Sequence, residues 1–415
     1  MLAFVYSFSM FFQPGIFWPQ LGAYKPLVVL SILALFAGIG TKASYPRSSI
    51  YRHPAFVFLA LFLLIQVVSV YYSGLSSILE EFGYWYQYLA FVVASTLLMT
   101  DPKAINNFIW GMILGCMFVV FYGLYAVYAE LPASVGGKAG AYGMYENHND
   151  YSFIIIMVFP FIYAYFRESQ RPKSKFLLLF FLLACLVGIL LSLSRGGMIA
   201  FVLEGAMLVW FTVKKTKRLP LLFVIAVVGA VGIGYQFSKR AEVQGDNYTA
   251  EDSKSSRMEL WKAGINMVLS HPVLGVGSRR FGEYSREYGE ISHDNLGKNA
   301  HNTYIQILAT SGLLGFALFA GYVRSLLKGM RKCSFVGTDE NLERMRIVTL
   351  VAVYAILIRA FLDAKVHDWS FYTLCSIGLA LVALAEASAG SKKRDEDVEE
   401  QQIVRRNRMA HRYGR

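Results

Sequence analysis

Charged residues are scarce in this chain of 415 residues, since Asp, Glu, Lys and Arg together make up 16% of it. A soluble domain carries about 25%. Cysteine is almost missing, with four residues, and none of the spacings is typical of a zinc site. No repeat with a period of about 20–50 residues recurs along the chain. The composition excludes a disordered chain, a disulfide scaffold and a coiled coil.

Hydrophobic residues make up 55% of the chain and aromatic residues 15%, and the mean hydropathy is +0.43. The few charges are nevertheless unbalanced, with 40 Lys and Arg against 28 Asp and Glu and a net charge of +12. A nucleic-acid-binding protein would spread such a basic excess over a soluble face, so we expect no nucleic-acid partner. A membrane protein with basic loops accounts for both observations.

Apolar runs are long enough to cross a bilayer, whose hydrocarbon core of about 30 Å needs about 20 residues per helix. The sequence predicts an all-α integral membrane protein with about twelve transmembrane helices in a polytopic domain of residues 1–387. The predicted spans are 3–19, 24–41, 55–73, 84–100, 106–131, 151–167, 176–194, 198–213, 219–237, 303–323, 345–365 and 369–387.

The basic residues predict which way the chain faces. If the N-terminus is inside, 26 of the 40 basic residues fall in or beside inside segments, and nine fall in one long outside loop, 238–301. Long loops cross the membrane regardless of their charge, so both termini are predicted to be cytoplasmic. The basic tail, 388–415, is predicted to be disordered, and contact with anionic lipid is the alternative.

The long outside loop has a helical pattern just beyond the bilayer. We predict an amphipathic helix over Arg257–Leu269, lying on the membrane surface. Ser255 or Ser256 would cap it, and Pro272 would end it before a glycine turn. Its predicted apolar face consists of Met258, Trp261, Ile265 and Val268.

Four arginines outside the membrane are candidates for holding an anion. Arg195 lies between two apolar runs and beside glycines, so it could grip a phosphate bidentately; a snorkelling interfacial arginine is the alternative. Arg257, Arg279 and Arg280 lie in the long loop. That loop has nine basic and nine acidic residues, so only specific placement would favour an anion.

His301 begins an apolar span and could act as a general base near neutral pH; a hydrogen-bonded interfacial histidine is the alternative. Asn147 and Asn149 suit sugar hydroxyls or the capping of the following span. A metal site is only weakly suggested, and we predict none. Its possible ligands would be Glu146, His148, Asp150, His293 and Asp294.

Ionisable residues inside the apolar runs are few. Glu204 is isolated in its run, so it is either functional or paired. Arg359 and Asp363 are four residues apart, and we predict a structural ion pair on one helix face.

Three motifs occur in a fixed order along residues 140–325. They are Leu193-Ser194-Arg195-Gly196-Gly197, then Arg257 with His271-Pro272-Val273-Leu274-Gly275-Val276-Gly277, then Ala300-His301-Asn302-Thr303-Tyr304 with Gly312 and Gly315 at helical spacing. This order resembles the core domain shared by O-antigen ligases, O-antigen polymerases and bacterial O-oligosaccharyltransferases.

The resemblance implies a donor glycan on undecaprenyl pyrophosphate and an active site facing the periplasm of the bacterial inner membrane. In such enzymes arginines hold the pyrophosphate and a histidine activates the acceptor hydroxyl, without a metal or other cofactor. The implied pyrophosphate ligands are Arg195 and Arg257, with Arg279 and Arg280 as competitors, and the implied base is His301. Asn147, Asn149, Asn302 and Tyr304 are weaker candidates for the glycan.

The resemblance leaves the acceptor open. The first interpretation is an O-antigen ligase, whose acceptor is the lipid A core. As a membrane protein, it would also contact membrane lipids. A polymerase or a protein O-oligosaccharyltransferase would use the same donor with another acceptor. A lipid-linked sugar transporter would have inverted repeats and ionisable groups at mid-membrane. The polar residues gather on one face instead, which favours an enzyme.

Overall fold

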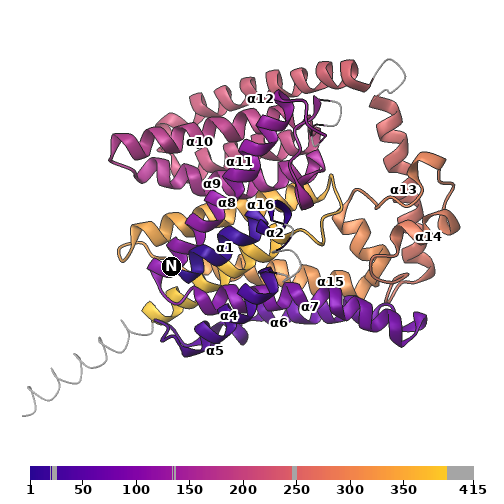
Figure 1. Cartoon of the computed structure of the whole chain (residues 1–415), viewed down its shortest axis with the longest axis horizontal. Helices are drawn as coiled ribbons and strands as arrows, with labels where there is room; N and C mark the ends of the chain where they lie inside the picture. The colour runs from indigo at the N-terminus through magenta and orange to yellow at the C-terminus, as the bar shows by residue number, and fades with distance from the viewer. Residues whose placement is uncertain (19, 21–25, 133, 135–136, 245–249, 390–415) are drawn as a thin grey trace, which may run out of the picture.

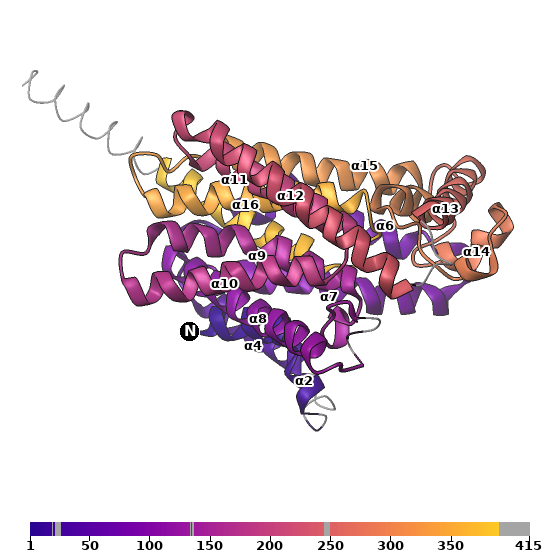
Figure 2. The same cartoon turned by 90° about the horizontal axis from the view of Figure 1, so that it is seen from above.

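The computed structural model describes residues 1–18, 20, 26–132, 134, 137–244 and 250–389, and this part of the chain is helical without a β-strand. The predicted all-α fold class is therefore confirmed. Residues 390–415, which make up most of the predicted basic tail, lie outside the described residues. The long helices lie side by side in one bundle, and two further helices, α13 and α14, lie beyond one end of it (Figures 1 and 2).

The first half of the chain contributes eight of the described helices to this bundle. They are α1 (Leu2–Phe12), α2 (Pro14–Phe17), α4 (Pro26–Gly40), α5 (Arg47–Tyr51), α6 (Pro54–Val68), α7 (Leu75–Leu98), α8 (Pro102–Tyr128) and α9 (His148–Glu168).

The second half continues the bundle and adds the two outer helices. Its described helices are α10 (Pro172–Leu191), α11 (Arg195–Thr212), α12 (Lys215–Gln244), α13 (Ala250–Ser270), α14 (Phe281–Tyr288), α15 (Thr303–Lys332), α16 (Glu340–Ala360) and the C-terminal helix (Trp369–Ala389).

Each predicted apolar run overlaps helical residues in the described parts of the chain, although the runs 3–19 and 303–323 are interrupted. Seven of the described helices are both long and apolar enough to cross a membrane, and three shorter helices are also apolar. The multi-pass character of the protein follows from these helices, whereas the count of about twelve spans stays a prediction. The loop predicted over 238–301 begins later than expected, because α12 continues to Gln244.

The first predicted span, 3–19, is wrong as one continuous helix. It is divided into α1 and α2 at Gln13, whose φ is 52°. Pro14 follows directly, and proline disfavours the helical conformation of the residue before it. The helix is therefore interrupted at Gln13.

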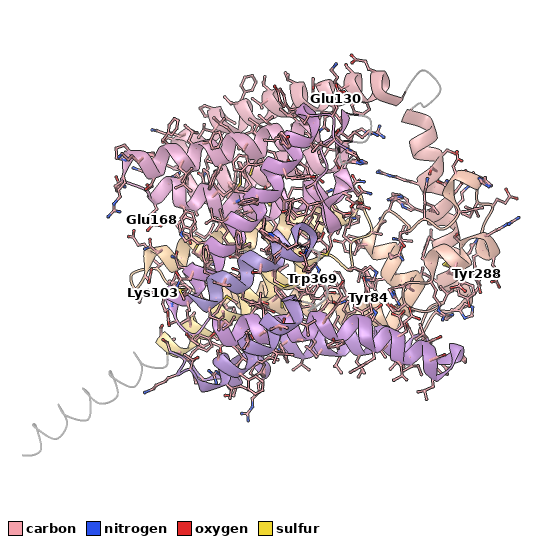
Figure 3. All side chains as sticks on the ribbon, viewed as in Figure 1. Tyr84, Lys103, Glu130, Glu168, Tyr288 and Trp369 are labelled. Atoms are coloured by element: carbon pink, nitrogen blue, oxygen red, sulfur yellow. The ribbon has the colours of Figure 1, made fainter. Side chains whose placement is uncertain are left out.

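The two ends of the bundle differ in what they carry. Figure 3 places Lys103 and Glu168, from turns predicted to be cytoplasmic, near one end, and Tyr288 of α14 at the other. Met1 also lies at the end away from α13 and α14 (Figures 1 and 2). The chain's start, Lys103 and Glu168 thus lie at the end of the bundle opposite to Tyr288.

The helix predicted over Arg257–Leu269 exists, but its cap and its buried face were predicted wrongly. Helix α13 begins earlier, so Ser255 and Ser256 lie inside it. Its buried side chains include Leu260 and Met267, whereas Met258 and Ile265, on the predicted face, are exposed. Small residues decide this face: a Cβ on Gly264 would lie 2.6 Å from Cγ2 of Ile305 in α15, so α13 approaches α15 on its small-residue side.

Helix α15 is interrupted at Gly312, which has φ 67° and ψ −169°. The extended segment after α13 pairs with the interruption: Leu313 N donates to Pro272 O at 2.8 Å, and Val276 N donates to Ala309 O at 2.9 Å. A Cβ on Gly312 would overlap the carbonyl of Val273. The expectation of an unbroken helix with glycines at helical spacing is therefore wrong, and the break joins the outer helices to the bundle.

Candidate functional site

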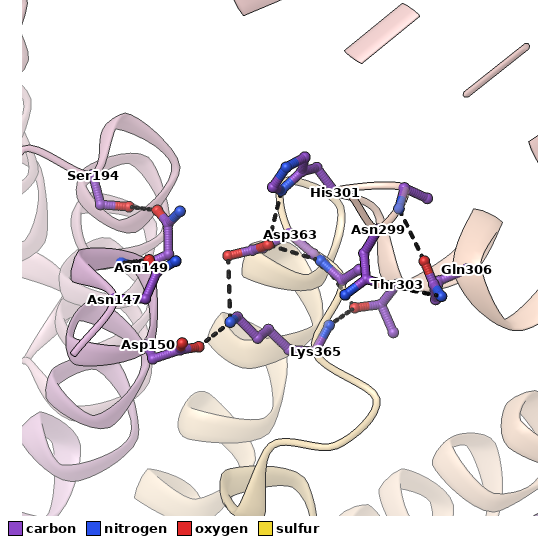
Figure 4. A network of polar contacts seen from close by, with 12 residues as sticks. Asn147, Asn149, Asp150, Ser194, Asn299, His301, Thr303, Gln306, Asp363 and Lys365 are labelled. Carbon is purple, nitrogen blue, oxygen red and sulfur yellow. Dashed lines mark hydrogen bonds and ion pairs between the residues drawn. The ribbon is translucent and has the colours of Figure 1, made fainter. Parts of the chain in front are cut away.

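Polar side chains converge where three helices begin. The N-caps of these helices are Asn147 for α9, Ser194 for α11 and Asn302 for α15. The segment 361–368, which links α16 to the C-terminal helix, runs between them (Figure 4). We call this convergence the candidate site. Helix N-termini carry unpaired N–H groups and partial positive charge, so they favour anionic ligands.

His301 and Asp363 form an acid–base pair at the centre of the candidate site. Nδ1 of His301 lies 3.3 Å from Oδ1 of Asp363. The histidine side chain is 34% exposed and the aspartate 7%. With the proton on Nδ1 donated to Asp363, Nε2 is the basic nitrogen, and a carboxylate oriented in this way prepares a histidine for general-base catalysis.

His301 has a backbone conformation that suits this position. Its φ is 48°, in the left-handed region, directly before Asn302, the N-cap of α15. A positive φ is uncommon outside glycine and tends to occur at functional sites. The turn sets the imidazole beside segment 361–368 rather than along α15 (Figure 4).

Asp363 is shared by three positively charged or polar neighbours. Nη2 of Arg359 lies 3.3 Å from its Oδ2, and Nζ of Lys365 lies 3.9 Å from the same oxygen. Burial acts to raise the pKa of Asp363, but the charges of Lys365 and Arg359 and the hydrogen bond to His301 outweigh it and hold this pKa well below its usual range. The carboxylate therefore stays ionised at neutral pH.

Arg359 connects Asp363 to the starts of α9 and α11. Its Nη2 donates to Oδ1 of Asn149 at 3.1 Å and to Oγ of Ser194 at 3.3 Å. Ser194 Oγ in turn donates to Oδ1 of Asn149 at 2.7 Å. The predicted Arg359–Asp363 pair is thus confirmed, although it belongs to a larger network and is not an isolated pair.

Lys365 extends the network to Asp150 in the first turn of α9. Its Nζ forms an ion pair with the Asp150 carboxylate, and its backbone N–H donates to Oγ1 of Thr303 at 2.9 Å. The Thr303 hydroxyl donates to the carbonyl of Asp363 at 2.7 Å. Sequence reasoning missed the roles of Lys365 and Asp150, and the one available signal was their position at the ends of apolar runs.

The structure separates the four candidate arginines into two pairs. Arg195 opens α11 with its guanidinium 5.1 Å from the ring centre of Phe237. Arg257 lies on α13, and its positive charge acts on Arg359. Arg195 therefore lies at the start of α11, next to the N-cap Ser194, whereas Arg257 lies on α13.

Arg279 and Arg280 instead contact α7. Arg279 forms ion pairs of 2.8 Å with both Glu80 and Glu81, and its guanidinium lies 4.3 Å from the ring centre of Tyr84. Nη2 of Arg280 donates to Ser77 Oγ at 3.1 Å. Because two carboxylates already compensate the charge of Arg279, these contacts fasten the loop after α13 to α7.

The weaker glycan candidates mostly have structural partners. Oδ1 of Asn302 accepts from the N–H groups of Tyr304 and Ile305, and Asn147 Oδ1 accepts from Asn149 N. The Tyr304 hydroxyl donates to the carbonyl of Leu357 at 2.8 Å. Of the four candidates, Asn149 joins the network around Asp363, and glycan contacts of the others stay predictions.

Two further residues or groups lie outside the network. Glu204 is fully buried in α11, and neither carboxylate oxygen has a hydrogen-bond partner among the described residues. Of the two alternatives for Glu204, pairing is therefore not observed, and a functional role stays a prediction. No group of three or more His, Cys, Asp or Glu side chains that could hold a metal occurs in the described residues.

Comparison with known families finds one match. A sequence model of the O-antigen ligase family matches residues 178–320, which include Ser194, Arg195, Arg257 and His301, whereas Asp363 lies beyond the matched region. No curated protein matches the chain. Residues 178–320 of this chain are therefore similar to the O-antigen ligase family.

Proposed function

We propose that this protein is an O-antigen ligase that transfers a glycan from undecaprenyl pyrophosphate to a hydroxyl group of the lipid A core. The reaction takes place at the periplasmic face of the bacterial inner membrane, and both termini are cytoplasmic. The observation that carries the proposal is the pairing of His301 with Asp363 at 3.3 Å, beside the start of α11 in a domain matched by the O-antigen ligase family.

In the proposed reaction His301 is the general base. Its Nε2 takes the proton of the acceptor hydroxyl as the hydroxyl oxygen bonds to the anomeric carbon of the donor sugar. The bond from that carbon to the diphosphate oxygen breaks, and undecaprenyl pyrophosphate leaves with the electron pair. Asp363 stabilises the imidazolium that forms. Attack in line with the leaving group inverts the anomeric configuration.

The leaving diphosphate requires preorganised positive charge. We assign it to Arg195 and Arg257, because guanidinium groups bind phosphate oxygens bidentately, and the N-terminus of α11 adds unpaired N–H groups. The favoured second arginine is Arg257 rather than Arg279, since Arg279 already pairs with Glu80 and Glu81. Arg359 adds a buried positive charge behind Asn149 and Ser194.

The test is a transfer assay with full-length protein purified in detergent and a glycan on undecaprenyl pyrophosphate. Three acceptors are compared: core lipid A, a second lipid-linked glycan and a pilin-like protein. Transfer to core lipid A alone supports the ligase, and transfer to either of the others identifies a polymerase or a protein glycosyltransferase instead. Turnover without a sealed membrane excludes a transporter.

The variant that tests the proposed base is His301→Ala, which should retain folding and lose transfer. Full activity in this variant would remove His301 as the base. The configuration of the new glycosidic bond, measured by NMR, tests the in-line mechanism, because retention of configuration contradicts a single displacement.

A further inference from the structure

A groove lies at the end of the bundle opposite the candidate site. It has a volume of about 780 Å³, within the roughly 300–1,000 Å³ of ligand pockets. Helices α11, α12, α15 and α16, which lie next to one another (Figure 2), all contribute to its lining. Since α11 and α15 begin at the candidate site, their later residues in this lining, Phe211 and Arg331, lie at the far end. We call it the α11–α16 groove.

The lining of the groove changes from apolar to basic along the bundle. Nearest the candidate site it consists of apolar side chains such as Leu203 of α11 and Ile358 of α16. At the other end it contains Arg331, in the last turn of α15, and Arg346, near the start of α16. Ile358 and Arg346 are twelve residues apart on α16, about 18 Å at a rise of about 1.5 Å per residue. This length is about half of a hydrocarbon core of about 30 Å, so the groove fits an amphiphile that occupies one leaflet.

Arg331 is available to bind the head of such a molecule. Its Nη2 donates to the hydroxyl of Tyr354, and its guanidinium lies 5.5 Å from the ring centre of Tyr354. Among the described residues, no carboxylate lies within 4.0 Å of Arg331, whereas Arg346 pairs with Glu343. A guanidinium has five N–H donors, so Arg331 retains enough of them to bind a phosphate bidentately.

The loop between α11 and α12 adds positive charge at the same end. It carries four basic side chains, Lys214, Lys215, Lys217 and Arg218. The guanidinium of Arg218 lies 5.2 Å from the ring centre of Trp210, which lines the groove. No Asp or Glu occurs in the sequence from 205 to 241, and the N-terminus of α12 adds N–H groups with partial positive charge. The basic end of the groove therefore favours an anionic head and repels a cationic one.

Position and charge together select the occupant. Basic pockets between transmembrane helices bind the head groups of anionic lipids. The lipid-linked donor of the proposed reaction belongs at the candidate site, which is at the other end of the bundle and therefore in the other leaflet. A phospholipid fits the groove, because its acyl chains extend through one leaflet and its phosphate lies at the edge of the hydrocarbon core.

We propose that the α11–α16 groove binds an anionic phospholipid of the leaflet away from α13 and α14. An acyl chain lies along Leu203, Met207 and Ile358, and the phosphate contacts Arg331. In the proposed orientation this is the cytoplasmic leaflet. The assignment depends on the helices crossing a membrane and is independent of glycan transfer.

Two matched pairs of variants test the groove. Arg331→Gln removes the charge that would bind the phosphate, and Arg324→Gln removes an exposed arginine of the same helix outside the lining. Ala206→Phe fills the apolar part of the groove, and Ala230→Phe adds the same ring to an exposed position of α12 outside it. Arg331 contacts one side chain in the structure, the ring and hydroxyl of Tyr354, so its variant is expected to fold.

The first measurement is the affinity for one added lipid, by native mass spectrometry of the full chain in detergent. The lipids are dioleoyl phosphatidylglycerol and dioleoyl phosphatidylcholine, which differ in head group only. We expect phosphatidylglycerol to bind about tenfold more tightly, and Arg331→Gln to weaken its binding about tenfold, because charge-assisted hydrogen bonds are about twice as strong as neutral ones. Arg324→Gln should match the wild type. Equal affinities for the two lipids, or an unchanged Arg331→Gln variant, overturn the head-group site.

The apolar part of the groove is tested in the same titration. Ala206→Phe should weaken the binding of both lipids, and Ala230→Phe that of neither. Unchanged binding by Ala206→Phe would exclude an acyl chain from the groove. Undecaprenyl phosphate carries a phosphate on an isoprenoid chain; if it displaces phosphatidylglycerol at equal concentration, the occupant is the lipid carrier and the phospholipid assignment is wrong.

The second measurement locates the bound lipid. Trp210 lines the groove and is 55% exposed, so phosphatidylglycerol with brominated acyl chains should quench its fluorescence. The contribution of Trp210 is the difference between the wild type and Trp210→Phe. Arg331→Gln should require about tenfold more brominated lipid for the same quenching. If the lipid binds and the Trp210 signal stays unchanged, the lipid lies elsewhere and the proposal is refuted.

Discussion

Replacing Asp363 by Asn is the sharpest perturbation of the proposed mechanism. The substitution keeps the size of the side chain but removes the charge that faces His301 at 3.3 Å. At an effective dielectric constant of about 20, a carboxylate and an imidazolium at this distance attract each other by about 5 kcal/mol. Because His301 is 34% exposed, solvent screens part of this attraction. We expect kcat to fall about 10²–10³-fold, which corresponds to about 3–4 kcal/mol.

The assay is steady-state transfer to the acceptor that the wild type prefers, with kcat and the donor KM measured separately. Asp363 acts through His301 as a positioning residue, so kcat should fall while the donor KM changes little. The matched control is Asp150→Asn, which also removes a carboxylate from Lys365 but does not contact His301. It should lose much less activity.

A double-mutant cycle distinguishes positioning from a general structural role. In the His301→Ala background, Asp363→Asn should cause almost no further loss, because residues that act as a unit are not additive. Losses that add fully would refute the reasoning, and so would a kcat of Asp363→Asn within threefold of the wild type. Thermal unfolding of each variant shows whether it is folded.

Three further predictions follow from the same contacts. Arg195→Lys should lower the rate of transfer about 10–100-fold, since the bidentate contact with the diphosphate is lost. The exposed control Arg286→Lys should match the wild type. Equal activity of both variants removes Arg195 from the phosphate site. Gly312→Ala should lower the free energy of unfolding by at least about 2 kcal/mol, because φ is 67° and the new Cβ would meet the carbonyl of Val273. The control Gly234→Ala, where a Cβ meets nothing within 4 Å, should not destabilise the protein. Unchanged stability of Gly312→Ala contradicts this account of the break in α15. Burial, with the charges of Arg279 and Lys365, lowers the pKa of His367 to about 3. Between pH 6.5 and 3 the unfolded chain therefore binds a proton that the folded chain does not. The free energy of unfolding should fall as the pH drops below 6.5, by up to about 1.4 kcal/mol per pH unit. Unfolding measured at pH 7.5 and 5.5 should show a smaller drop for His367→Asn than for the wild type, and equal drops would mean that another group is responsible.

Local patterns predicted the helices well. Apolar runs, caps and basic loops depend on neighbouring residues and on the bilayer, so the positions of α8 to α11 follow from the sequence to within a few residues. The same local reasoning placed Arg195 and His301 at the starts of apolar runs, which are the starts of α11 and α15, and it offered capping as the alternative for Asn147.

The failures of the local patterns have physical causes in packing. The buried face of α13 is set by Gly264 against Ile305, and the break in α15 is set by its pairing with the segment that contains Pro272 and Val276. Neither partner can be read from the hydrophobic pattern of the helix concerned, since the pattern records which residues are apolar and not which neighbour they meet.

The sequence by itself determined that this is a helical protein with several apolar helices, and it contained motifs that resemble those of the O-antigen ligase family. Only the tertiary structure decided that Asp363 faces His301 from 62 residues away and that Arg359 meets Asn149 across 210 residues. An ion pair or hydrogen bond forms where side chains are brought within about 3 Å, and separation along the chain does not limit it.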